Sequence, residues 1–166
     1  MIDTFDDLFR QVGEEEGIEP WLLKAIAIKE SSLIPYSYRF GRGERRFYKR
    51  RIEGRADWTA HRYYDRPEII AASWGLMQLL YTTAILVGFP REGDPWELMD
   101  NYLENIRYGA RWFRMKLRIC HHVAPALAAY NAGSANYRDD GTFQNQWYVD
   151  KVLAYAEQCR ERMQAA

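Results

Sequence analysis

The sequence of 166 residues predicts an all-α fold built as one domain over residues 1–166. Apolar residues recur at the three- and four-residue spacing of helices in segment after segment, and no stretch alternates apolar and polar residues as a half-buried strand does. Apolar residues make up 48% of the chain, which is enough to form a core, and no linker or internal repeat divides it.

The first helix is expected to run from a capping Thr4 to the glycines Gly13 and Gly17, since an apolar face of helical spacing lies between them. The second begins at Pro20, whose missing N–H costs nothing at a first helical position. The residues that follow, Trp21 to Ile28, are apolar nearly all round, which indicates a helix at the centre of the core.

Five further helices are expected after residue 70. The first runs from Ser73 toward Val87, and a short one follows Asp94-Pro95. A longer helix spans about 102–117, a helix of small residues spans 126–132, and the last begins near Trp147. Small side chains let helices approach closely, so the small-residue helix should be buried. Across the fold the residues expected to be largely buried are Leu23, Ile26, Ala27, Leu79, Leu127 and Val152.

The segment of about residues 36–70 differs from the rest and is interpreted as a basic, aromatic insertion. Between Arg39 and Arg55 eight basic residues stand against two acidic ones, a net charge of +6 in a chain that is neutral overall. Three interpretations are open: a solvated loop or short helix whose arginine stems cover apolar surface, a lid over a polyanionic or glycan substrate, and a nucleic-acid surface. If the segment is such a lid, it should lie along the rim of a cleft.

Composition excludes several classes of function. A neutral chain with a pI near 6.8 has no global attraction to nucleic acid or to anionic membranes. Cys120 and Cys159 form no CxxC pattern and are expected to be free thiols, and the three histidines have no metal-ligand spacing. Neither a metal nor another cofactor is therefore expected. No stretch reaches the ~18 apolar residues that span a bilayer, and the acidic start from Met1 to Asp7 does not resemble a secretion signal.

Glu30 is the candidate catalytic residue. Pro35 limits the apolar second helix, so Glu30 lies in or just after its last turn, at the edge of the core. A carboxyl group in an apolar setting prefers its neutral form, which raises its pKa. Such a group can deliver a proton at neutral pH, as cleavage of a glycosidic bond requires. The alternative is a solvated glutamate at a helix end.

Three short blocks stand in order along the chain: Glu30-Ser31, Gly75-Leu76-Met77-Gln78, and Ala129-Tyr130-Asn131-Ala132-Gly133. Together they resemble the soluble lytic transglycosylase family, relatives of goose-type lysozyme. The pairs Asn105-Ile106, Gly109-Ala110 and Tyr148-Val149 also look like the family, and the resemblance spans about residues 18–155.

The resemblance implies a lysozyme-like helical fold with a cleft for glycan strands. It implies cleavage of the β-1,4 bond between N-acetylmuramic acid and N-acetylglucosamine in peptidoglycan, with formation of a 1,6-anhydromuramic acid end. Glu30 matches the family's acid, which then acts as base, while the substrate's N-acetyl group and C6 hydroxyl replace a second carboxylate. Tyr130 matches the tyrosine near this acid. The residues expected to bind substrate are Ser31, Met77, Gln78, Tyr130 and Asn131.

Departures from the family pattern keep two alternatives open. The connection from Glu30 to Gly75 is long, and Ile69 stands about where the family has a serine. An acid within this connection that positioned a water would make the protein a hydrolytic lysozyme; the candidates are Glu53, Asp57, Asp65 and Glu68. The other alternative is a non-catalytic, peptidoglycan-binding virion component.

The expected setting is that of a bacteriophage enzyme. Without a secretion signal or lipid anchor, the chain resembles an endolysin released by a holin or a virion component that opens the wall. It is expected to be made in the cytoplasm, to act as a monomer on peptidoglycan strands of the cell wall, and to need no nucleic-acid partner.

Overall fold

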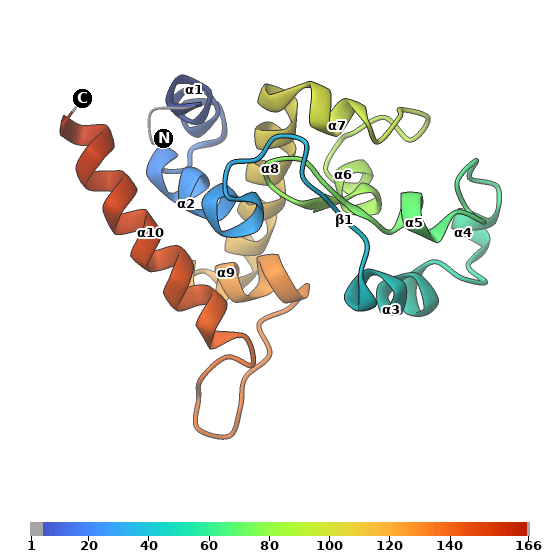
Figure 1. The fold of residues 1–166 in the computed structure, drawn as a ribbon. Coiled ribbons are helices and arrows are strands. Elements are labelled where there is room, and N and C mark those ends of the chain that lie inside the picture. Colours follow the sequence, from blue (N-terminus) through green and yellow to red (C-terminus); the bar gives the residue numbers. More distant parts are fainter. Residues whose placement is uncertain (1–4, 166) are drawn as a thin grey trace.

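The computed structural model describes residues 5–165, so the predicted cap Thr4 lies outside the described residues. The fold is mostly helical, as predicted, with a small sheet beside the helices (Figure 1). The longer helices are α1 (Asp6–Glu16), α2 (Pro20–Ser31), α3 (Arg42–Arg51), α8 (Tyr102–Cys120), α9 (Val123–Ala132) and α10 (Gln146–Ala165). The short ones are α4 (Ala56–Thr59), α5 (Pro67–Ile70), α6 (Tyr81–Leu86) and α7 (Glu97–Asp100). No helix within residues 5–165 has the length and apolar character needed to cross a membrane.

Helix α2 lies at the centre of the helical core. It packs along α10 and also against α1 and α8, because its apolar residues face all directions. The six residues predicted to be largely buried are at most 2% exposed, which confirms that prediction. The helix ends where Ser32 adopts a left-handed backbone conformation (φ +55°), so Glu30 lies in its last turn as expected. Cys120 and Cys159 are both free thiols.

The helix predicted from Ser73 toward Val87 is wrong over its first half. Strands β2 (Ser73–Trp74) and β3 (Leu79–Leu80) form an antiparallel hairpin there, and β1 (Tyr38–Arg39) pairs with β2 on its other side. Gly75 (φ +75°) and Gln78 (φ +45°) have backbone angles that a right-handed helix excludes. The helical part of the prediction is α6 alone.

Asn105 of α8 holds the hairpin turn in place. Its side-chain amide donates to the carbonyl of Trp74 at 3.1 Å and accepts from the N–H of Met77 at 2.8 Å. A Cβ on Gly75 would lie 2.4 Å from this amide, so only glycine fits at that point of the turn. The turn therefore depends on a residue of α8 as well as on the local glycine.

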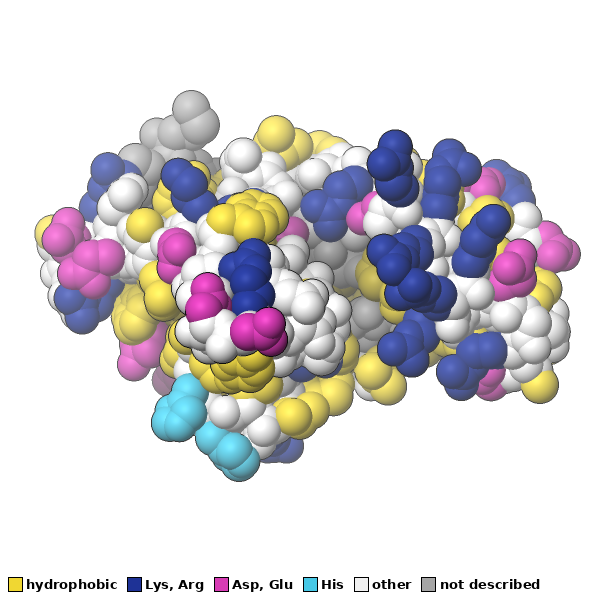
Figure 2. Space-filling model, turned by 90° about the horizontal axis from the view of Figure 1, so that it is seen from below, with side chains coloured by type: hydrophobic (Ala, Val, Ile, Leu, Met, Phe, Trp, Pro, Cys, Tyr) yellow, Lys and Arg dark blue, Asp and Glu magenta, His cyan; other side chains and the backbone are white. Residues whose placement is uncertain are grey.

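Residues 36–70 form a lobe of their own on the far side of the sheet from α2 and α10, made of β1 and the helices α3 to α5 (Figure 1). The space-filling view shows the molecule hollowed between this lobe and the rest, and lysine and arginine side chains gather on the lobe (Figure 2). The predicted change of character in this segment thus corresponds to a structural unit.

Candidate active site

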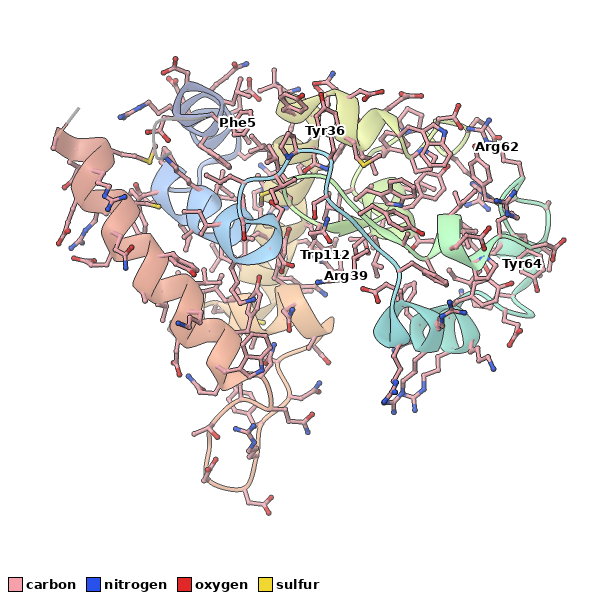
Figure 3. The ribbon with its side chains drawn as sticks, in the orientation of Figure 1. Phe5, Tyr36, Arg39, Arg62, Tyr64 and Trp112 are labelled. Carbon is pink, nitrogen blue, oxygen red and sulfur yellow. The ribbon has the colours of Figure 1, made fainter. Side chains whose placement is uncertain are left out.

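A cleft of about 1060 Å³ runs between the lobe and the helical core. One wall is formed by α3 and α4, the opposite wall by α8 and α9, and the floor by the β2–β3 hairpin with α6. Arg39 of β1 and Trp112 of α8 both line the cleft and lie in the central region between α3 and α9 (Figure 3). The acid at the end of α2, Glu30, lines this same cleft.

The carboxyl group of Glu30 is enclosed by protein, although the residue as a whole is only half-buried. Burial raises its pKa above the usual glutamate range, because the charged form loses its water. A hydrogen bond from Tyr148 and the charges of Arg39 and Lys29 act in the opposite direction without cancelling the effect. Glu30 is therefore a carboxyl group that keeps its proton to a higher pH than an exposed glutamate does.

The hydrogen-bond partner of Glu30 is Tyr148, from α10. Its hydroxyl lies 2.7 Å from Oε1 of Glu30, and its ring is fully buried. Burial places the pKa of Tyr148 well above its ordinary value, so the hydroxyl stays a donor. Tyr148 was not among the predicted site residues. The signal that could have identified it is the similarity of Tyr148-Val149 to the family. We had expected Tyr130 in this position.

Tyr130 lies on the cleft wall, but its hydroxyl is directed elsewhere. It donates to the carbonyl oxygen of Met77 at 2.8 Å and so ties α9 to the hairpin turn. The pKa of Tyr130 is also well above its ordinary value through burial, with a contribution from the charge of Glu30. Tyr130 is thus near the acid without being the residue that hydrogen-bonds it.

Two of the other predicted substrate-binding residues are buried behind the cleft. The hydroxyl of Ser31 lies 3.0 Å from the carbonyl oxygen of Ala27 and 2.8 Å from that of Leu76, which joins the end of α2 to the hairpin turn. Met77 is fully buried, with its side chain packed against Gly109 of α8. Neither Ser31 nor Met77 is among the residues that line the cleft.

Gln78 and Asn131 do line the cleft. The amide nitrogen of Gln78 donates to the carbonyl oxygens of Ser37 and Gly75 at 2.9 and 3.1 Å, which fixes the orientation of the side chain. Asn131 is exposed, and its side-chain oxygen accepts from Asn145 at 3.0 Å. Both amides are therefore held in place by neighbouring groups before any ligand arrives.

The four acids that could position a water, Glu53, Asp57, Asp65 and Glu68, differ in whether they reach the cleft. Of the four candidates only Asp57 lines the cleft, where it forms an ion pair with Arg55. A further acid that we did not consider, Glu44 of α3, also lines the cleft. Burial alone would raise the pKa of Glu44, but hydrogen bonds from the N–H of Gly41 and from the guanidinium of Arg39 outweigh it and lower the pKa. Glu44 is therefore ionised.

The outer face of α3 is strongly basic (Figure 2). Six of its cationic side chains are exposed, and within residues 5–165 none of the six forms an ion pair. They are Arg42, Arg45, Arg46, Lys49, Arg50 and Arg51. Arg51 also lines the cleft, so the basic face continues to its edge. In the described residues no cluster of three or more His, Cys, Asp or Glu side chains could hold a metal ion.

Comparisons with known proteins agree with this geometry. A family model, the transglycosylase SLT domain, matches residues 7–148. A comparison with curated proteins gave no match. Among solved structures, an inactive mutant of the lytic transglycosylase Slt from Pseudomonas aeruginosa superposes with a TM-score of 0.66 at 19% sequence identity. The match covers 98% of this chain and 25% of that one, so this chain spans about a quarter of that protein's length. The predicted lysozyme-like helical fold is thereby confirmed.

Proposed function

The chain belongs to the transglycosylase SLT domain family, and on this basis we propose that it is a peptidoglycan lytic transglycosylase. The observation that carries the proposal is Glu30, an enclosed carboxyl group of raised pKa on the wall of a long cleft. A non-catalytic binding component has no need to keep an ionisable group in such a position, where its charged form is unfavourable.

In the proposed reaction Glu30 first acts as a general acid. Its proton passes to the oxygen that links N-acetylmuramic acid to N-acetylglucosamine, and the C1–O bond breaks. The N-acetyl group of the substrate stabilises C1, which makes a second carboxylate unnecessary. Glu30, now a carboxylate, accepts the proton of the C6 hydroxyl as its oxygen bonds to C1. The product carries a 1,6-anhydromuramic acid end, and Glu30 regains its starting state.

The structure supports a division of roles among the motif residues. We propose that Gln78, Asn131 and the ring of Tyr130 contact the glycan, since all three line the cleft. Ser31 and Met77 would instead hold the end of α2 and the hairpin turn in register, through the contacts described above. The solved Slt structure is of an inactive protein in which glutamine replaces a glutamate, which agrees with an essential glutamate in this fold.

The basic face of α3 suits the wall itself as a partner. Peptide stems of peptidoglycan carry carboxylates, and six exposed cations beside the cleft would attract them. We propose that residues 36–70 are an insertion in a single catalytic domain, and that this insertion guides intact wall to the cleft. The protein would act as a monomer on the cell wall, as a phage endolysin or as part of a virion.

A hydrolytic lysozyme is the second candidate, because Glu44 places an ionised carboxylate in the same cleft. Both of its oxygens already accept hydrogen bonds, from Arg39 at 2.8 Å and from the N–H of Gly41 at 2.9 Å. These contacts lower the pKa of Glu44 and make it a weaker base for activating a water, which favours the transglycosylase proposal.

The deciding experiment is mass spectrometry of the soluble fragments released from purified peptidoglycan. Anhydro ends resist borohydride reduction, whereas borohydride converts the reducing ends made by a lysozyme into sugar alcohols. We expect anhydro ends from the native protein. We also expect a loss of roughly 10²–10⁴-fold for Glu30→Gln, the usual contribution of general acid–base catalysis. Reducing ends would establish the hydrolase instead, and full activity of Glu30→Gln would overturn the mechanism.

A further inference from the structure

Arg39 and Glu44 form an ion pair on the wall of the cleft that has no part in the reaction as described so far. Nε of Arg39 lies 2.8 Å from one carboxylate oxygen of Glu44, and the N–H of Gly41 donates to the other oxygen at 2.9 Å. The Glu44 side chain is only 10% exposed, whereas that of Arg39 is 51% exposed. The carboxylate is thus the fixed end of the pair, and the guanidinium is the end open to the cleft.

The backbone of Arg39 is fixed as well. Arg39 ends strand β1 and pairs with Ser73 of β2, and both residues line the cleft together with Glu30. The charge of Arg39 favours the ionised form of Glu30. A strand from the lobe therefore places a cation on the same cleft as an acid of the helical core.

The other groups that face Glu30 do not duplicate this role. The charge of Lys29, on α2, also lowers the pKa of Glu30, but less than that of Arg39 does. The ammonium of Lys29 lies over the ring of Trp147, 4.7 Å from the centroid. Tyr148 of α10 donates a hydrogen bond without carrying a charge. Tyr130 of α9 is likewise neutral, and Glu44 of α3 is an anion that opposes ionisation of Glu30.

We propose that Arg39 is the counter-cation of the carboxylate that Glu30 becomes during turnover, and that Glu44 is a positioning residue that holds Arg39 there. This inference rests on the proposed function. When the O–H bond of Glu30 breaks and the proton moves to the glycosidic oxygen, an anion is left in an enclosed site. It persists until the C6 hydroxyl returns a proton. A fixed cation stabilises that anion, and burial still holds the pKa of Glu30 above its ordinary value.

The first test replaces Arg39 and follows activity against pH. Activity that requires protonated Glu30 is lost as the pH rises through the pKa of Glu30. Arg39→Gln removes the cation, so this loss should move to higher pH while kcat falls about tenfold, equivalent to about 1.4 kcal/mol. Arg39→Lys keeps the charge and should stay near the native pH profile. The matched control is Arg55→Gln, which breaks another ion pair of the same cleft and should leave the position of the loss unchanged.

The second test asks whether Glu44 acts through Arg39. If it does, the loss of kcat in Glu44→Ala should not exceed the loss in Arg39→Gln. The kcat of the double variant should be no lower than that of Arg39→Gln alone, because without Arg39 the remaining effect of Glu44 is a charge that opposes ionisation of Glu30. Additive losses would overturn the positioning role. Circular dichroism and thermal denaturation of each variant identify any loss of fold.

The third test needs no turnover. In protein labelled with ¹³C-glutamate, the carboxyl signal of Glu30 is assigned by its absence from Glu30→Gln and titrated in each variant. A higher pKa in Arg39→Gln than in the native protein and in Arg39→Lys supports the contact, and an unchanged pKa overturns the inference. A native protein that shows the contact but releases no fragments from peptidoglycan would instead overturn the proposed function and, with it, the role in turnover.

Discussion

Replacement of Tyr148 by phenylalanine removes a single oxygen from a fully buried ring, the oxygen that lies 2.7 Å from Oε1 of Glu30. A hydrogen bond to a charged group contributes about 1.5–3 kcal/mol. The bond strengthens as Glu30 loses its proton, and if its full value is lost in the transition state, kcat falls roughly tenfold to a hundredfold.

The pH profile should change in a defined direction. The hydrogen bond from Tyr148 lowers the pKa of Glu30, opposing the burial that raises it. Without the bond the pKa rises further, and protonated Glu30 persists to higher pH. The alkaline loss of activity in Tyr148→Phe should therefore lie at higher pH than in the native protein, even though its maximum rate is lower.

Tyr130→Phe is the matched control, because it also removes a buried hydroxyl that makes one hydrogen bond. That bond joins the carbonyl of Met77 rather than Glu30, so its loss should lower the free energy of unfolding by about 0.5–1.5 kcal/mol and leave the alkaline loss of activity in place. The assay is kcat against pH on soluble peptidoglycan fragments, with thermal denaturation of each variant. An unmoved profile in Tyr148→Phe, or an equal shift in Tyr130→Phe, would refute the assignment.

Three further predictions concern stability and binding. At a pH below about 4.3, the pKa of glutamate in the unfolded chain, Glu30→Gln should unfold at the same temperature as the native protein. At higher pH it should unfold at a higher temperature than the native protein. A raised pKa in the folded state makes native stability fall as the pH rises through it; equal melting at all pH values would contradict this. Gly109→Ala should destabilise by about 1–3 kcal/mol, because its Cβ would lie 2.6 Å from the Met77 side chain, whereas Gly43→Ala meets nothing within 4 Å and should not destabilise. Replacing four residues of α3 by serine should weaken binding to intact walls at low salt and leave the fold intact. The four are Arg45, Arg46, Arg50 and Arg51. Unchanged binding would show that the basic face of α3 does not bind the wall.

The parts of the fold that could be predicted are those whose signal is local. The run from Trp21 to Ile28 is apolar except for Lys24, which a central helix accommodates, and the structure buries residues 22–27. The hairpin at 73–80 has apolar residues at helix-like spacing. Gly75 is its one local turn signal, and the amide of Asn105, some thirty residues further on, holds the turn. No local pattern contains that contact.

The same distinction between local signals and long-range contacts explains which site residues could be predicted. Glu30 could be found because its burial follows from the helix that carries it, and Gln78 and Asn131 because they stand in short motifs that the fold brings to the cleft. Tyr148 and Tyr130 are both buried tyrosines near helix ends, and the sequence holds no information on which hydroxyl reaches an acid 118 residues from Tyr148. Motif membership alone also could not separate residues that line a cleft from residues that brace it.

Glu44 could not be predicted as a cleft residue for a different reason. It stands in a run whose net charge is strongly positive, so its neighbours suggested a solvated basic helix. In the structure it is the third helical residue of α3, and its carboxylate accepts from the N–H of Gly41 just before the helix. A residue that caps a helix can thus also fix a neighbouring arginine, and the two functions share one side chain.

The proposed reaction places two opposing requirements on Glu30, and different parts of the molecule meet them. The acid must hold its proton at rest, which burial at the end of α2 favours by raising its pKa. It must also exist briefly as an anion, which a hydrogen bond from α10 and a cation from β1 both stabilise. The first two elements belong to the helical core, whereas β1 leads into the basic lobe. Any displacement of the lobe that moved Arg39 away would raise the pKa of Glu30 and destabilise its anion. If the proposed reaction holds, the strength of the acid thus depends on the position of the lobe across the cleft.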